Sequence, residues 1–365
     1  MKEDVALAIQ ELPKRKIKAI LNDPEKTAEA IHLVYVNDLE TRGITRKRKG
    51  KGFEYYLENK LVKDHDTLAR IKSLVIPPAW ENVWICALEN GHLQATGTDI
   101  KQRKQYRYHP YWIALRNHTK FYRMLNFGAA LPKMRLQIEK DLALKELTQR
   151  KVLAAVVSLM ERTNIRVGNN LYEKLYGSFG LTTLKDQHVN IKNTELHFSF
   201  KGKKGVYHTI NLKSRRLAKV VQQCKDIPGK ELFQYYDKEG KRHAIDSGMV
   251  NQYIKEISGE DYTTKDFRTW SGTVNAFLAF KELGEAEDNT QAKKNIVAVL
   301  DTVAQQLGNT RAVCKKYYVH PLIVSLYENN SIHKYFRELE HIEEDDNRSS
   351  LTADEKIIMK ILKTA

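Results

Sequence analysis

Cysteine is scarce in this 365-residue sequence, which contains Cys86, Cys224 and Cys314 and no more. None of the three stands in a C-x-x-C pair or beside a histidine at zinc-finger spacing, which argues against a structural zinc site and a disulfide framework. No run approaches the roughly 18 apolar residues that span a bilayer. Met1 to Glu11 also contains acidic residues and no apolar core, unlike a secretory signal. We therefore expect a cytoplasmic protein with no membrane partner.

Two nucleotide-binding signatures are missing as well. The sequence has neither the G-x-x-x-x-G-K-[ST] loop that cradles phosphates nor a G-x-G-x-x-G turn after a strand. We therefore expect activity without a nucleotide, and we assign no cofactor and no metal.

Positive charge is abundant. The 61 Lys and Arg residues exceed the 45 Asp and Glu residues, giving a formal net charge of +16 and a pI near 9.4. Such a surplus points to a polyanionic partner, which could be RNA, DNA or a membrane surface on this observation alone. With 42% hydrophobic residues the chain is able to fold, and its length favours two domains.

The first hundred or so residues show signals of strands and turns. Asp23-Pro24 is typical of a helix start. Phe53 to Leu57 and Val83 to Leu88 are rich in aromatic and branched residues, which favours strands. Asn90-Gly91 then predicts a type I′ hairpin turn leading into a strand from Leu93. This region is predicted to be a small, β-rich domain.

From about Leu131 the hydrophobic period changes from 2 to 3.6, which predicts helices. One β-hairpin interrupts them, with alternating apolar residues in 196–200 and 208–212 and a basic turn at 201–205. Near the C-terminus, Thr352 and Glu355 form a capping box that predicts a last helix.

The predicted fold class is therefore α+β, with a small β-rich N-terminal domain and a larger, mostly helical second domain that carries an inserted β-hairpin. We predict boundaries at 1–112 for the N-terminal domain, 113–343 for the helical domain, and 344–365 for an acidic linker and the last helix.

Two segments concentrate the positive charge. Residues 42–51 hold six Lys or Arg side chains, and residues 101–109 interleave basic residues with Tyr106 and Tyr108. Cations can pair with phosphates while amides and phenols reach base edges in a groove. The ordinary alternatives are a solvated loop for the first segment and an edge strand with one wet face for the second. Both readings of the second segment stay open on composition alone. If it contacts nucleic acid, the contact residues are Arg103, Lys104, Gln105, Tyr106, Arg107 and Tyr108.

Four separated motifs contain a set of residues suited to phosphodiester chemistry. The set consists of Arg166, Lys203, Arg268, Asn309 and Tyr318. A phenol has a pKa of about 10, so a nucleophilic tyrosine needs neighbouring cations that favour phenolate and stabilise the transition state. Two arginines can hold the non-bridging oxygens, a lysine crowded by Lys201 and Lys204 could protonate the leaving alkoxide, and the asparagine can donate to a phosphate oxygen.

In this combination the sequence resembles the type IB DNA topoisomerases of poxviruses and bacteria, from about Asp38 to about Tyr327. Each motif is weak alone, but together they follow the family's order at near-family spacings. They are RKQYRYH at 103–109, IRVGN at 165–169, KGKKG at 201–205, KDFRTW at 265–270, and LGNT with KKYYVHP within 307–321.

The resemblance implies that Arg166, Lys203 and Arg268 match the family's catalytic Arg, Lys and Arg, and that Tyr318 matches its nucleophile. It implies a bacterial branch, since Asn309 stands where the poxvirus pattern has His. It also implies a monomeric, nucleoid-associated clamp on double-stranded DNA that works without ATP or metal. Gln105, Tyr106 and Tyr108 would face the major groove, and we add Lys204 and Lys265 to the expected DNA contacts.

Some alternatives stay open at this stage. Tyr317 lies beside Tyr318, and only the distance from Asn309 and the following Val-His-Pro favour Tyr318. A tyrosine recombinase uses a related residue set, although Lys265 stands where recombinases usually have His. A non-enzymatic DNA-binding protein would use the same cations for phosphate contact. The scattered histidines, His208 among them, show no ligand spacing and are interpreted as surface or structural residues.

Overall fold

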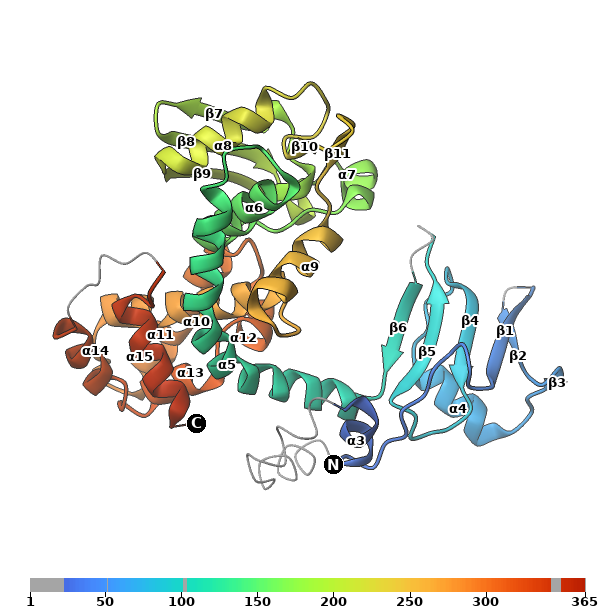
Figure 1. Cartoon of the computed structure of the whole chain (residues 1–365). Coiled ribbons are helices and arrows are strands. Elements are labelled where there is room, and N and C mark those ends of the chain that lie inside the picture. Colours follow the sequence, from blue (N-terminus) through green and yellow to red (C-terminus); the bar gives the residue numbers. More distant parts are fainter. Residues whose placement is uncertain (1–22, 51, 101–103, 343–348, 365) are drawn as a thin grey trace. The chain divides into compact units, whose positions relative to one another are not determined.

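The computed structural model describes residues 23–50, 52–100, 104–342 and 349–364, and divides into two compact units, Met1–Phe121 and Tyr122–Ala365. Figure 1 shows the elements of both units. Among the described helices, none is long and apolar enough to cross a membrane.

The first unit is built on one antiparallel six-stranded sheet with the order β3-β2-β1-β4-β5-β6. Its helix α3 begins as predicted, because the side chain of Asp23 caps it by accepting from the backbone of Glu25 and Lys26. The elements are α3 (Pro24–Glu29), β1 (Gly43–Lys49), β2 (Gly52–Leu57), β3 (Lys60–Leu61), α4 (His65–Ser73), β4 (Glu81–Cys86), β5 (Leu93–Thr98) and β6 (Lys104–Tyr108).

Helix α4 covers one face of this sheet. Ile71 of α4 packs against Ile44, Ile85 and Ala95, which are neighbours across β1, β4 and β5. Because strand side chains alternate, the neighbouring residues Thr45, Trp84 and Thr96 lie on the opposite face. The sheet therefore has a packed face towards α4. The second face carries a smaller buried cluster of Val36, Cys86 and Leu93 around Trp84, together with polar and basic residues.

The turn between β4 and β5 differs from the prediction. Neither Asn90 nor Gly91 has a positive φ, so the connection is not a type I′ turn. Gly91 instead pairs with Val34 in an isolated bridge, and a Cβ at this glycine would lie 2.6 Å from the Sγ of Cys86. The glycine thus serves a close tertiary approach, which the dipeptide signal could not reveal.

The second unit is mainly helical. Helix α5 (Pro110–Leu142) leads into it from the first unit. The remaining helices are α6 (Gln149–Thr163), α7 (Asn170–Tyr176), α8 (Arg215–Lys225), α9 (Ser247–Ser258), α10 (Thr264–Leu283), α11 (Asn289–Gln306), α12 (Arg311–Tyr317), α13 (Pro321–Glu328), α14 (His333–Glu340) and α15 (Ala353–Lys363), with short 3-10 turns η1 (Leu181–Thr183), η2 (Asp186–His188) and η3 (Lys203–Gly205).

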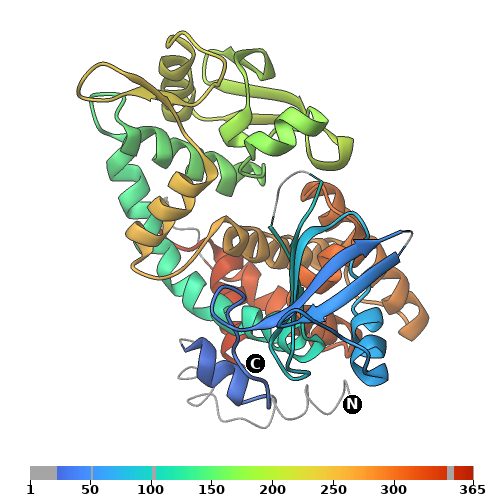
Figure 2. The ribbon, with the colours of Figure 1, turned by 90° about the vertical axis from the view of Figure 1, so that its right-hand side faces the viewer.

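The predicted hairpin is present as β8 (Glu195–Lys201) and β9 (Tyr207–Lys213), and β7 (Val189–Lys192) extends it to three strands. Leu196, Phe198 and Phe200 are buried on one face, as their alternation predicts. A further small pair consists of β10 (Gln234–Tyr236) and β11 (Arg242–Ala244). Within the second unit these strands lie with α7 and α8 at one end, and α10 to α15 lie at the other (Figures 1 and 2).

Together these elements confirm the predicted fold class, since a β-rich N-terminal part is followed by a helical part with an inserted hairpin.

Candidate active site

Arg268 lies in the first turns of α10 and is 5% exposed. Its Nη1 donates to the carbonyl of Asn164 at 2.6 Å, and its Nη2 donates to the carbonyl of Leu307 at 2.7 Å. Its Nε is buried without a hydrogen-bond partner in the part of the chain that the structure describes. Burial lowers the pKa of this guanidinium. Two carbonyls from distant segments thus fix the direction of the side chain.

Arg166 follows α6, whose C-cap Asn164 has a left-handed backbone conformation that turns the chain towards the site. The Nη2 of Arg166 donates to the carbonyl of Gly308 at 2.9 Å and to the Oδ1 of Asn309 at 2.7 Å. Burial, reinforced by the positive charge of Arg268, lowers the pKa of Arg166 to about 10. At neutral pH the guanidinium therefore remains charged.

The amide of Asn309 has a defined orientation. Because a guanidinium can only donate, the Oδ1 of Asn309 must face Arg166. Its Nδ2 then lies on the other side, where it donates to the carbonyl of Leu307 at 3.3 Å. An amide NH₂ carries two donor hydrogens, so a second one remains for another acceptor.

Tyr318 follows α12 directly and lies under Arg268, with the guanidinium carbon 5.2 Å from the ring centroid. Its carbonyl accepts from the Oγ1 of Thr273 at 3.3 Å. Gly272 permits this close packing, since a Cβ there would lie 2.6 Å from the same carbonyl oxygen. The neighbouring Tyr317 has its ring near Lys316 instead, with the Nζ 5.3 Å from the centroid.

Lys203 lies at the tip of the β8–β9 hairpin, in the short turn η3. Partial burial is the main cause that lowers its pKa, followed by the positive charge of Arg166, with a smaller effect of Lys204. The lowered pKa fits the prediction, but its main causes differ from the predicted crowding by Lys201 and Lys204.

His208 is a neighbour of the site that the sequence interpretation passed over. A Cβ at Gly308 would lie 2.8 Å from the Cε1 of His208 and 3.3 Å from the Nη1 of Arg166, so the imidazole lies beside that arginine. The ring also stacks on Phe200 at 5.2 Å. Burial, then the charges of Arg166 and Arg268, lower the pKa of His208. His208 lies on β9 opposite Phe200 in the strand register, close to the hairpin tip that carries Lys203. This position in the predicted hairpin is the sequence signal that could have placed His208 near the site.

In the first unit, β6 divides the predicted groove residues between two faces. Tyr106 and Tyr108 stack with ring centroids 5.9 Å apart. Gln105 alternates to the α4 face and donates to Asp99 at 2.9 Å, and Arg107 on that face donates to the carbonyl of Val75 at 2.9 Å. Gln105 therefore lies on the opposite face of the sheet from Tyr106 and Tyr108, although the three were predicted together to face the major groove.

The other predicted contacts are placed as follows. Lys104 forms an ion pair with Asp38 at 2.6 Å on the tyrosine face. Lys204 and Lys265 are exposed, Lys204 beside Lys203 and Lys265 in the first turn of α10. Arg103 lies outside the described residues.

Comparisons with known proteins show the class of protein to which this chain belongs. Residues 101–345 match the family model described as "Eukaryotic DNA topoisomerase I, catalytic core", and residues 52–99 match "Bacterial DNA topoisomerase IB, N-terminal domain". The class of protein is therefore DNA topoisomerase, a DNA-binding isomerase.

Relatives agree with this class. The DNA topoisomerase 1B of Acanthamoeba polyphaga mimivirus is 33% identical over 297 residues, covering 79% of this chain and 88% of the relative. The DNA topoisomerase I of Monkeypox virus is 27% identical over 258 residues, covering 69% and 77%. The chain belongs to the type IB DNA topoisomerase family, which confirms the resemblance that its motifs carry.

One solved structure matches part of the chain at low identity. The XerH site-specific recombinase bound to difH substrate covers 53% of this chain and 49% of its own, at 16% identity and a TM-score of 0.32.

Proposed function

We propose that Tyr318 is the nucleophile of this type IB topoisomerase and that it attacks one strand of duplex DNA. Its phenolic oxygen forms a bond to phosphorus, and the bond from phosphorus to the 5′ oxygen breaks. The products are a 3′ phosphotyrosyl linkage and a free 5′ hydroxyl. The observation that carries this assignment is the contact of the Arg268 guanidinium with the Tyr318 ring at 5.2 Å.

The proposed roles of the neighbouring residues follow from their hydrogen-bonding capacity. Arg166 and Arg268 bind the non-bridging oxygens and stabilise the charge that develops in the transition state. Asn309 donates its second amide hydrogen to a phosphate oxygen. Lys203, with its lowered pKa, protonates the departing 5′ oxygen. The supporting observation is that Arg166 and Asn309 are hydrogen-bonded to each other.

Relaxation is proposed to need neither ATP nor a metal ion. A phosphodiester is exchanged for a phosphotyrosyl ester of similar kind, so the linkage retains the energy needed for religation. While the strand is open, rotation of the free end removes supercoils of either sign, and attack by the 5′ hydroxyl restores the strand.

We also infer that the partner is double-stranded DNA, bound by a monomer in association with the nucleoid. The proposed DNA contacts with exposed or half-buried side chains are Lys104, Gln105, Tyr106, Arg107, Tyr108, Lys204 and Lys265. Arg103, which lies outside the described residues, is kept in the proposed set. The segments 1–112, 113–343 and 344–365 remain the proposed domain division.

Two single substitutions test the nucleophile. The full-length chain is mixed with a duplex and quenched with SDS, and the covalent protein–DNA adduct is measured. Tyr318→Phe removes the attacking oxygen and should abolish the adduct, whereas the matched control Tyr317→Phe should retain it. An adduct that persists in Tyr318→Phe and disappears in Tyr317→Phe would reverse the assignment.

A further inference from the structure

The C-terminal helix α15 lies outside residues 101–345, the part that matches the topoisomerase catalytic-core model. It is nevertheless well packed, with Ile357, Ile358 and Ile361 buried. In its first turn Glu355 is 6% exposed, an unusual position for a carboxylate unless it is fully paired.

Glu355 accepts four hydrogen bonds. Its Oε1 accepts from the Nη2 of Arg135 at 2.7 Å and from the indole Nε1 of Trp270 at 2.9 Å. Its Oε2 accepts from the Nη1 of Arg135 at 2.8 Å and from the backbone of Thr352 at 3.0 Å. The carboxylate is therefore satisfied at both oxygens and joins α15 to α5 and α10.

Both side-chain partners of Glu355, Trp270 and Arg135, are connected to Arg268 or to the segment that orients it. Trp270 lies two positions after Arg268 on the same helix, α10. Arg135 also binds Glu161 at 2.8 Å, in the last turn of α6. Three residues later, Asn164 provides the carbonyl that receives Nη1 of Arg268. Glu355 is thus connected both to the helix that carries Arg268 and to the segment that orients it.

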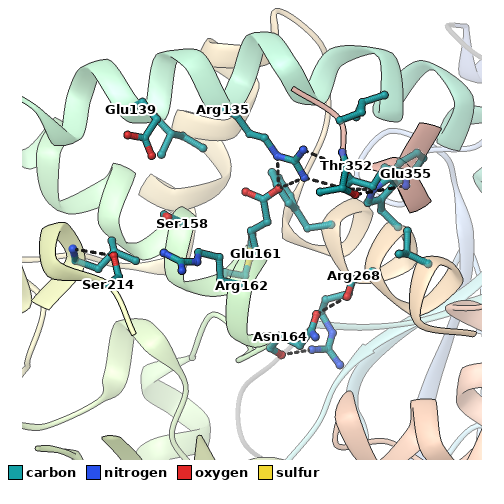
Figure 3. A pocket seen from close by; sticks show the side chains of 18 of the residues that line it. Arg135, Glu139, Ser158, Glu161, Arg162, Asn164, Ser214, Arg268, Thr352 and Glu355 are labelled. Atoms are coloured by element: carbon teal, nitrogen blue, oxygen red, sulfur yellow. Dashed lines mark hydrogen bonds and ion pairs between the residues drawn. The ribbon is translucent and has the colours of Figure 1, made fainter. Parts of the chain in front are cut away.

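These connected residues line a cavity of about 600 Å³. Its walls include Arg135, Glu161, Trp270, Arg268 and Glu355. Figure 3 shows Arg135 between Glu161 and Glu355, with Arg268 and Asn164 hydrogen-bonded nearby. Because packed atoms of the described residues do not fill this space beside Arg268, the position of its helix depends more on the polar links around the cavity than it would in a close-packed core.

We propose that Glu355 is a positioning residue for DNA cleavage. Through Trp270 the C-terminal helix holds α10, and through the Arg135–Glu161 pair it holds the segment that contains Asn164. These contacts keep the guanidinium of Arg268 where it binds the scissile phosphate. The inference rests on the proposed catalytic role of Arg268. It assigns to the C-terminal extension a role in the rate of chemistry and not in DNA affinity.

The test measures single-turnover cleavage at saturating DNA together with equilibrium DNA affinity, using the full-length chain. Glu355→Ala removes all four bonds, and Trp270→Phe keeps an aromatic ring but removes the indole donor. A displacement of about 1 Å can cost about 100-fold in rate. We therefore expect cleavage to slow by about 10- to 100-fold in Glu355→Ala and less in Trp270→Phe, with DNA affinity unchanged. In the double variant the loss should be smaller than the product of the two single losses.

The control is Lys356→Ala, an exposed neighbour on the same helix, which should cleave like the wild type. Circular dichroism at the assay temperature checks folding, and Trp270→Phe alone decides if Glu355→Ala does not fold. Cleavage at the wild-type rate in the folded variants, or a loss matched by an equal loss of DNA affinity, would overturn the inference. Arg268→Ala is measured in parallel. Normal cleavage by Arg268→Ala would overturn the proposed role of Arg268 itself. Loss of cleavage in Arg268→Ala, with normal cleavage in Glu355→Ala and Trp270→Phe, would overturn the positioning role alone.

Discussion

Neutral acceptors hold both arginines of the site. Arg268 donates to two backbone carbonyls, and Arg166 donates to one carbonyl and one side-chain amide. A carboxylate partner would orient a guanidinium equally well but would also neutralise it. With neutral acceptors, each side chain is oriented and keeps its full positive charge for an anion. This arrangement suits a site that must stabilise charge as it develops on a phosphate.

Lys203 gives a prediction for pH dependence. A general acid must be protonated, so the single-turnover cleavage rate should fall as pH rises through the pKa of Lys203. Because burial and Arg166 lower that pKa, the fall should begin below the ordinary value of 10.5. Lys203→Ala should slow cleavage by about 100- to 10,000-fold and remove this limb of the pH profile.

Lys204→Ala is the matched control at the same hairpin tip. It removes only a minor contribution to the lowered pKa, together with a proposed DNA contact. At saturating DNA the rate should therefore stay near that of the wild type, and the limb should move slightly to higher pH. A Lys203→Ala profile that keeps the wild-type limb would contradict the proposed role of Lys203.

At the scale of elements, strand β1 divides its basic residues between the two faces of the sheet. Arg46 lies on the α4 face, where it donates to the carbonyls of Pro77 at 3.1 Å and Trp80 at 2.6 Å, and its guanidinium lies 4.1 Å from the ring centroid of Phe53. The adjacent Lys47 lies on the other face and is exposed. The high charge density of 42–51 is thus partly structural, which a count of basic residues could not show.

Arg46 and Lys47 therefore form a matched pair for substitution. Each phosphate that a cation neutralises on B-DNA contributes about −0.9 to the slope of log affinity against log salt. Lys47→Ala should reduce the magnitude of that slope by about 1 and leave the melting temperature unchanged. Arg46→Ala should leave the slope unchanged and reduce the free energy of unfolding by about 1 to 3 kcal/mol, because carbonyls lose their donor. The reverse pattern in DNA titrations and thermal melts would contradict this division of roles.

Elements with strong local signals could be predicted from the sequence. The alternating residues of β8 and β9 and the Thr352–Glu355 capping box are both found where the pattern indicated. Features that depend on tertiary approach could not be predicted. Gly91 serves a bridge to Val34, and His208 enters the site only because the hairpin brings it beside Gly308. The capping box likewise indicated a helix start but not that Glu355 binds Arg135 and Trp270.

At the scale of the whole molecule, the proposed catalytic residues all belong to the second unit, Tyr122–Ala365. They come from the segment after α6, the β8–β9 tip, α10 and the region from Gly308 to Tyr318. The first unit is a separate sheet that matches the bacterial topoisomerase IB N-terminal domain over 52–99. The net charge of +16 indicated only a polyanion, and family membership narrows that polymer to DNA.

The most direct test of this account is relaxation of a supercoiled plasmid by the full-length chain in EDTA and without ATP. The account predicts a ladder of topoisomers that proceeds to full relaxation of both negatively and positively supercoiled plasmid, with no added metal or nucleotide. Failure to relax the plasmid, or relaxation that appears only after a divalent metal or ATP is added, would contradict it.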